Sequence, residues 1–269
     1  MAVILEGGCR VSMIREGEPR IAGTLKIWRH VGRDVGARDI SLRVLEYGRG
    51  VSAMLRNPGC DELIYVLEGT ATIIIDDLMY ELQPEVGIYV RPNQAFSVQN
   101  PNPTPVVLIS SQCPEPDCGP EISHFSRDDA ESTLRSPLTG TATNPIRPSI
   151  SPLVRLADRE SLPTADRWYR VLVDHEVGCH QATQFVGSIP PGRAPDHFHL
   201  YEEVLFILRG EGRMWAGKRS TAIAAGSCVY LPKRQVHCVE NTSTGELRLL
   251  GVFYPAGSPA VRYDSNADE

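Results

Sequence analysis

Short apolar runs, many of them alternating with polar residues, recur along the whole chain. SLRVLEY, LIYVLEG and TATIII are examples from the first half, and ATQFVGSI and VLFILRG are examples from the second. A side-chain period of two is that of a β-strand, and Gly, Pro and Asn residues separate the runs as turns do. Long helical periodicity is nearly absent. The pattern therefore predicts an all-β protein built as a sandwich or barrel.

A region of different composition separates two strand-rich halves. Pro, Ser and Thr become frequent from about residue 111 to 166. The best helix candidate lies there, at Ser126–Arg135, with a serine at the cap and acids in the first turn. We therefore expect an N-terminal barrel at residues 1–118, a linker with a short helix at 119–165, and a C-terminal barrel at 166–269.

The two halves repeat each other. At a constant offset, DELIYVLEGTATI aligns with EEVLFILRGEGRM, so that Glu62 falls on Glu203 and Asn100 falls on Asn241. A repeat of this length indicates two copies of one domain rather than a solenoid.

Composition limits the possible partners and the location of the protein. The 269 residues are 42% apolar, enough for a buried core, and the formal net charge of −6 argues against nucleic-acid binding. No apolar stretch is long enough to span a membrane. The first residues, MAVILEGG, lack the basic region of a signal peptide, so we expect a cytoplasmic protein.

Four side chains of the second half form a candidate metal site. His197 and His199 are two residues apart and therefore share a strand face. Glu203 begins the next apolar run, and its parity carries Leu205 inward with it. His237 follows a further strand and would supply a fourth ligand. Three imidazoles and one carboxylate suit a divalent transition metal (Fe, Mn, Ni, Zn or Cu) rather than calcium.

These residues stand in the motifs G-x4-H-x-H-x3-E-x6-G and G-x5-P-x4-H-x3-N, the second with Arg234 where a glycine often stands. Both motifs resemble those of the cupin superfamily, and the repeat makes the chain similar to a bicupin. The resemblance implies two cupin-type double-stranded β-helix (jelly-roll) barrels in tandem. It also implies that His197, His199, Glu203 and His237 bind one metal ion.

The first half does not repeat the ligand set. At the same offset, Arg56 and Pro58 take the places of the first two histidines, and Phe96 or Ser97 takes that of the third. Only Glu62 is kept, and one carboxylate does not hold a metal. We therefore expect no metal in the N-terminal barrel.

A lone buried carboxylate needs a partner of opposite charge. We expect Glu62 to pair with a base such as Arg56 or Arg91, or to contact a small ligand.

Substrate contacts are less well specified by the sequence. Arg193 and Tyr201 flank the predicted ligands, and Tyr230 lies on the strand before Pro232, so we expect these three to meet substrate. Val229 and Leu231 occupy the opposite face of that last strand, and the sequence leaves open which face lines the pocket.

An open metal position favours catalysis on a small, oxygen-rich chelating substrate, with Glu203 as the candidate base. The resemblance implies first a dioxygenase, like the bicupins that cleave flavonols, gentisate or diketones. The second alternative is a non-redox isomerase, decarboxylase or hydrolase, similar to oxalate decarboxylase or to ureidoglycine aminohydrolase. The third is a binding protein without catalysis. Since bicupins often pair and exposed edge strands need cover, we also expect a homodimer.

Overall fold

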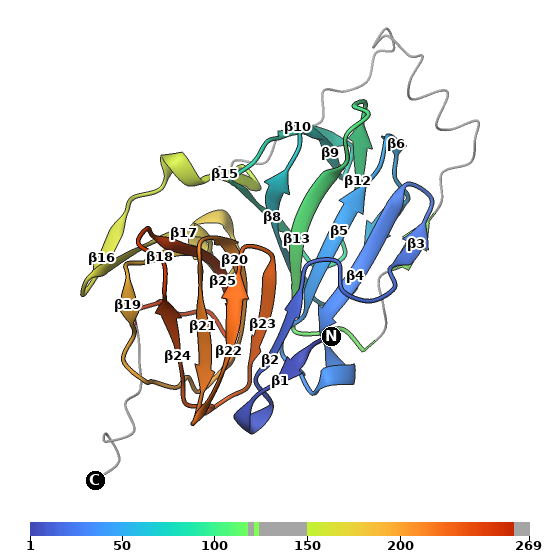
Figure 1. Cartoon of the computed structure of the whole chain (residues 1–269). Coiled ribbons are helices and arrows are strands. Elements are labelled where there is room, and N and C mark those ends of the chain that lie inside the picture. Colours follow the sequence, from blue (N-terminus) through green and yellow to red (C-terminus); the bar gives the residue numbers. More distant parts are fainter. Residues whose placement is uncertain (118–120, 124–149, 261–269) are drawn as a thin grey trace, which may run out of the picture.

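The computed structural model describes residues 1–117, 121–123 and 150–260. It consists of two β-barrels that lie side by side, each closed from a larger and a smaller antiparallel sheet (Figure 1). The expectation of tandem jelly-roll barrels is confirmed. The helix expected at Ser126–Arg135 lies outside the described residues.

The N-terminal barrel pairs a seven-stranded sheet with a smaller one. The seven strands follow the order β15 (Leu153–Arg155), β11 (Val86–Val90), β8 (Asp61–Glu68), β13 (Val106–Cys113), β5 (Leu42–Tyr47), β4 (Leu25–Val31) and β3 (Arg20–Ala22). The smaller sheet follows the order β10 (Leu78–Leu82), β9 (Ala71–Ile75), β12 (Ala95–Asn100), β7 (Met54–Arg56) and β14 (Glu121–Ser123), with β6 (Gly50–Val51) also paired to β12.

The C-terminal barrel repeats this plan. Its eight-stranded sheet follows the order β1 (Val3–Ile4), β2 (Arg10–Met13), β23 (Ser227–Leu231), β20 (Glu202–Arg209), β25 (Leu247–Tyr254), β18 (Thr183–Ile189), β17 (Arg167–Val173) and β16 (Leu162–Thr164). Its four-stranded sheet follows the order β19 (Gly192–Arg193), β24 (His237–Asn241), β21 (Glu211–Ala216) and β22 (Arg219–Ala224).

The barrels exchange strands, which the expected domain boundaries do not describe. β2 pairs with β23 along the edge of the C-terminal sheet, although it belongs to the first residues of the chain (Figure 1). In return, β15 pairs with β11 of the N-terminal barrel, although its residues were expected in the linker. The exchange covers one edge of each large sheet, where unpaired backbone groups would otherwise meet water.

Alternation along each central strand divides its side chains between two cores. Leu205 and Ile207 of β20 point into the C-terminal barrel, as expected from the parity of Glu203. Val204 and Phe206 point the other way, into a core that both barrels share with β5, β8 and β13. The barrels are therefore joined by a continuous apolar layer, which favours one fixed arrangement.

The sequence repeat corresponds to a structural repeat. Asn100 donates hydrogen bonds to the carbonyl oxygens of Tyr47 and Thr104, and Asn241 donates two equivalent bonds to Ile189 and Gly245. Each amide closes the loop that follows its strand.

The described helices are four single 3-10 turns, at Glu6–Gly8 (η1), Arg33–Val35 (η2), Leu156–Asp158 (η3) and His175–Val177 (η4). None of them has the length and apolar character that a bilayer-spanning helix requires.

Candidate metal centre

Three histidines meet inside the C-terminal barrel. His197 and His237 face each other across an isolated antiparallel bridge, and their rings are 4.5 Å apart. The ring of His199 lies 5.0 Å from that of His197 and 5.2 Å from that of His237. The expected juxtaposition of these residues is therefore present in the structure.

Backbone carbonyl groups orient two of the three rings. The Nδ1 atom of His197 lies 3.0 Å from the carbonyl oxygen of Pro195, and that of His237 lies 2.7 Å from that of Gln235. Because a carbonyl oxygen can only accept, both Nδ1 atoms carry the proton. The Nε2 atoms are then left with a lone pair, which is the arrangement that metal-binding histidines use.

Burial favours the neutral form of these rings. His237 is 3% exposed, and burial, followed by the nearby His197, lowers its pKa to about 3. A neutral imidazole is the form that binds a metal.

Glu203 adds a carboxylate to the group. Its Oε2 atom lies 3.4 Å from Nε2 of His199, and the side chain is buried. Burial alone raises the pKa of this carboxyl to about 8. The surrounding protein therefore does not supply enough positive charge to balance the ionised carboxylate. A cation beside it would supply that compensation.

The cluster fits a divalent metal with little rearrangement. One ligand atom from each of the three histidines lies within 4.8 Å of the others. Two nitrogens bound to one ion at about 2.1 Å can be no more than about 4.2 Å apart, so closing the site requires a shift of about half an ångström. Imidazole and carboxylate donors together suit the first-row transition metals.

The sequence analysis expected Tyr201 to meet substrate beside the metal ligands. In the structure, its ring instead packs against the histidine cluster. Its ring stacks on that of His199 at 4.8 Å with an interplanar angle of 9°. On its other side it stacks on Phe253 at 4.7 Å. Tyr201 therefore positions His199 by packing.

Arg193 lies outside the barrel, which corrects its expected role in binding substrate. Its guanidinium pairs with Asp196 at 3.0 Å and lies 4.3 Å from the ring of Trp215. Its Nε atom lies 3.2 Å from the sulfur of Cys238, which points away from the histidines because it follows His237 on the strand.

Tyr230 is also misplaced by the sequence prediction. It is buried in the core between the barrels, and its hydroxyl lies 3.5 Å from the carbonyl oxygen of Gly36. Val229 and Leu231, the alternative pair, are the ones that point into the C-terminal barrel.

A small cavity of about 110 Å³ adjoins the cluster. His197, His199, Glu203 and His237 all line it, and its wall is mostly apolar, with Phe185 among its members. This volume is well below the roughly 300 Å³ at which pockets for drug-sized ligands begin. The site therefore suits a molecule of only a few heavy atoms.

Arg167 is a member of the cavity wall that the sequence analysis missed. Among the described wall residues it is the one Arg or Lys, as Glu203 is the one acid. It stands at the start of β17, next to the expected linker, and no motif marks it. Strand parity with Tyr169 is the signal that could have found it, because Tyr169 also points into this barrel.

The same positions of the N-terminal barrel hold different side chains. The pairing of His197 with His237 corresponds to that of Leu55 with Phe96. Asn57, two residues after Leu55, then stands in the place of His199. Phe96 was one of the two residues expected at the position of His237. Arg56 and Pro58 were expected at the positions of His197 and His199, which is wrong. One extra residue precedes Glu62 in the N-terminal barrel and shifts the alignment.

Glu62 is buried in an ion pair with Arg43 rather than with Arg56 or Arg91. The Nη2 atom of Arg43 lies 2.5 Å from Oε1 of Glu62, and the two side chains are 3% and 1% exposed. Ser110 donates to the same oxygen at 2.7 Å, and the amide of Asn57 donates to the other. The expectation of an ion pair is correct, and its partner is corrected.

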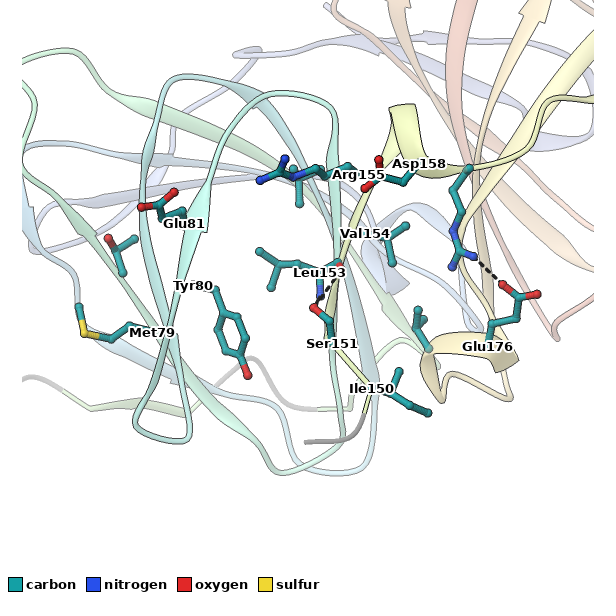
Figure 2. A pocket seen from close by; sticks show the side chains of 14 residues that line it. Met79, Tyr80, Glu81, Ile150, Ser151, Leu153, Val154, Arg155, Asp158 and Glu176 are labelled. Atoms are coloured by element: carbon teal, nitrogen blue, oxygen red, sulfur yellow. Dashed lines mark hydrogen bonds and ion pairs between the residues drawn. The ribbon is translucent and has the colours of Figure 1, made fainter. Parts of the chain in front are cut away.

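A larger hollow lies elsewhere in the described structure. It is an open groove of about 860 Å³ between β10, β15 and η4, and it shares no wall residue with the small cavity. Figure 2 shows Tyr80, Leu153 and Ile150 around it, with Glu176 at one end. Glu176 forms an ion pair with Arg159, which also lines the groove. The group of described residues that could hold a metal ion lies in the small cavity and not in this groove.

The comparison with protein families gives one result. The cupin domain matches the chain twice, at residues 41–111 and 185–253, which together make up just over half of it. The first match contains Glu62, and the second contains all four members of the C-terminal cluster.

Solved structures resemble the whole arrangement. A deletion mutant of oxalate decarboxylase from Bacillus subtilis superposes with a TM-score of 0.70 at 14% identity, over 91% of this chain and 76% of the other. The formate complex of oxalate decarboxylase from Lactobacillus farciminis gives a TM-score of 0.73 at 15% identity, over 92% and 87%. At these identities, the likeness shows the fold.

One curated relative matches in sequence. An uncharacterized protein of Streptomyces coelicolor is 37% identical over 60 residues, which is 22% of this chain. The match spans 56% of the length of that relative.

Proposed function

The chain belongs to the cupin family, and we propose that it is a metal-dependent enzyme that cleaves a small, chelating carboxylic acid. The observation that carries the proposal is the convergence of three histidines and Glu203 on a cavity of about 110 Å³. A cavity of this size favours a substrate of a few heavy atoms over the flavonols that some bicupin dioxygenases cleave.

His197, His199, His237 and Glu203 would hold one divalent transition metal. The metal would supply a Lewis acid that polarises an oxygen of the substrate. Glu203 would bind it through one carboxylate oxygen and keep the second as a candidate base toward an acidic proton. The Nδ1 hydrogen bonds of His197 and His237 fix the rings and so limit reorganisation during the reaction.

Decarboxylation is the reaction we favour. Its support is the small cavity, which suits a compact carboxylic acid, together with the likeness in fold to oxalate decarboxylases.

A dioxygenase, which the sequence favours, is the second candidate. The apolar wall formed by Phe185, Leu205 and Leu249 supports it, because apolar space admits dioxygen. We also retain the homodimer as a prediction, for which light scattering of the purified protein is the direct measurement.

The experiment is a turnover assay of protein loaded separately with Mn²⁺, Fe²⁺ and Ni²⁺. Oxalate and other two- to four-carbon acids are offered, and carbon dioxide and dissolved oxygen are followed together. Release of carbon dioxide without net oxygen uptake supports decarboxylation, and stoichiometric oxygen uptake supports a dioxygenase. If no metal form turns over any of these acids, the proposed function is wrong.

A further inference from the structure

Glu202 precedes the metal ligand Glu203 on β20 and binds a loop of the N-terminal barrel. We propose that Glu202 is a positioning residue, whose hydrogen bonds to residues 36–39 of the other barrel hold Glu203 in place for metal binding. This inference rests on the proposed function, because it assumes that the C-terminal cluster binds the metal.

Two successive backbone amides bind the Glu202 carboxylate. The N–H of Arg38 donates to Oε1 and Oε2 at 3.2 and 3.0 Å, and the N–H of Asp39 donates to Oε2 at 2.8 Å. Successive N–H groups of this kind form a concave site for an anion. Glu202 is only 6% exposed, and hydrogen bonds to a charged group are among the strong ones. The contact is therefore a firm one between the barrels.

The loop that supplies these amides is itself held in place. Ala37 and Ile40 are fully buried in the core that both barrels share. Gly36 has a φ of 97°, a backbone conformation that glycine adopts without strain, and its carbonyl oxygen lies 3.5 Å from the hydroxyl of Tyr230. The two amides therefore meet Glu202 from a packed segment rather than from a free surface loop.

The metal ligands lie where the C-terminal sheet has little regular pairing. Glu202 and Glu203 are the first two residues of β20, and residues 194–201 before them form no regular strand. Strand ends and irregular segments open at a lower free energy than the middle of a sheet. Fixing Glu202 from the other barrel therefore limits opening at the point where the carboxylate ligand enters the site.

A second contact joins the same loop to another ligand. Lys233 forms an ion pair with Asp39, and the N–H of the following Arg234 donates to the carbonyl oxygen of His199 at 2.7 Å. The Lys233 side chain is 49% exposed, so this pair contributes little energy. Its position nevertheless places the loop beside both His199 and Glu203.

The acid at the equivalent position of the N-terminal barrel has a different partner. Asp61 precedes Glu62 as Glu202 precedes Glu203, and it accepts a hydrogen bond from the hydroxyl of Tyr89 at 2.6 Å. Tyr89 belongs to β11 of the same barrel. The contact across the barrels thus accompanies the acid that lies among the histidines.

The test measures metal affinity and the geometry of the bound ion. Mn²⁺ binding is followed by electron paramagnetic resonance, and the visible absorption of Co²⁺-loaded protein reports on the arrangement of the ligands. Glu202→Ala should raise the dissociation constant for Mn²⁺ by about tenfold or more and change the Co²⁺ spectrum, as expected of a residue that orients a ligand. Glu202→Gln keeps the shape with a weaker acceptor and should give an intermediate affinity.

Glu211→Gln is the matched control. It removes one exposed carboxylate from β21 of the same barrel, and it should bind both metals as wild type does. Urea unfolding of each metal-free variant separates a loss of stability from a loss of metal affinity.

The outcomes separate the two proposals. If Glu202→Ala destabilises the fold but leaves the Mn²⁺ affinity and the Co²⁺ spectrum unchanged, Glu202 only joins the barrels, and its positioning role is wrong while the metal-dependent function stands. If Glu202→Ala does not fold, the same two readouts on Glu202→Gln decide. If wild type binds neither metal, both proposals are wrong.

Discussion

The two barrels place an acid at the same position and compensate it in different ways. In the C-terminal barrel, Glu203 lies among three histidines, and an added cation would complete the group. In the N-terminal barrel, Glu62 is compensated by the guanidinium of Arg43, a cation that belongs to the chain itself. The strand register places Arg43 opposite Ser110, where the other barrel has Phe185 opposite Gly251.

The difference shows how one fold can keep or lose a metal centre. A buried carboxylate persists only with a compensating charge. Once an arginine supplies that charge from within, histidines at the other positions are no longer needed, and Leu55 and Phe96 fill them as core residues.

The largest effect is expected from breaking the internal ion pair. Arg43→Met leaves Glu62 buried without its cation, and should lower the free energy of unfolding by about 3–5 kcal/mol. Urea denaturation measures the change. Arg91→Met is the matched control, because Arg91 is exposed on the same barrel, and it should change the value by no more than about 0.5 kcal/mol.

A double variant tests the reason for that loss. Arg43→Met with Glu62→Leu removes both charges and should recover most of the lost stability, since no unpaired ion remains. If Arg43→Met alone costs less than about 1 kcal/mol, the proposed compensation of Glu62 by Arg43 is incorrect.

The next effect is that of removing the metal. At a free Mn²⁺ concentration 100 times the dissociation constant, binding should stabilise the fold by about 2.7 kcal/mol, and a chelator should remove this increment. His199→Ala should show no such increment. Asn57→Ala changes the equivalent position of the N-terminal barrel and should keep the stabilisation by Mn²⁺. An equal loss in both variants would contradict the assignment of the ion to one barrel.

The smallest expected effect is on the pH dependence of the free energy of unfolding. His30 of the N-terminal half is 5% exposed and hydrogen bonded to Ser12 at 3.0 Å, and burial lowers its pKa from 6.5 to about 4. Between these two pKa values, His30 is protonated in the unfolded chain and neutral in the folded one. The free energy of unfolding therefore falls as the pH drops from 6.5 toward 4. Between pH 7 and 5 the loss from this group is about 2 kcal/mol.

His30→Gln should remove that part of the pH dependence, as measured by urea unfolding at both pH values. His175→Gln is the control from the C-terminal half, because the His175 side chain is 74% exposed. Should both variants leave the pH dependence equally unchanged, burial of His30 is not its cause.

The convergence of the three histidines and Glu203 was predictable because two short motifs contain all four residues. The spacing of His197 and His199 fixes their common face, and the parity of Glu203 with Leu205 fixes the direction of its side chain. Only His237 had to be brought from a distant part of the sequence, and the second motif supplied it.

Other features depend on partners far away in the sequence. Arg43 and Glu62 belong to strands that are not sequence neighbours, and Ser110 of β13 lies between them. The exchange of β2 for β15 likewise depends on tertiary packing that no local pattern encodes. Tyr230 was misassigned because both faces of its strand are apolar and buried, so alternation alone could not tell the barrel interior from the shared core.

The most direct test of the account is the number of metal ions bound per chain. Elemental analysis of Mn²⁺-loaded protein, after removal of loosely bound ions, should give one ion per chain for wild type and for Asn57→Ala, and close to none for His199→Ala. Two ions per chain in wild type, or one ion retained in His199→Ala, would contradict the claim that only the C-terminal cluster binds a metal.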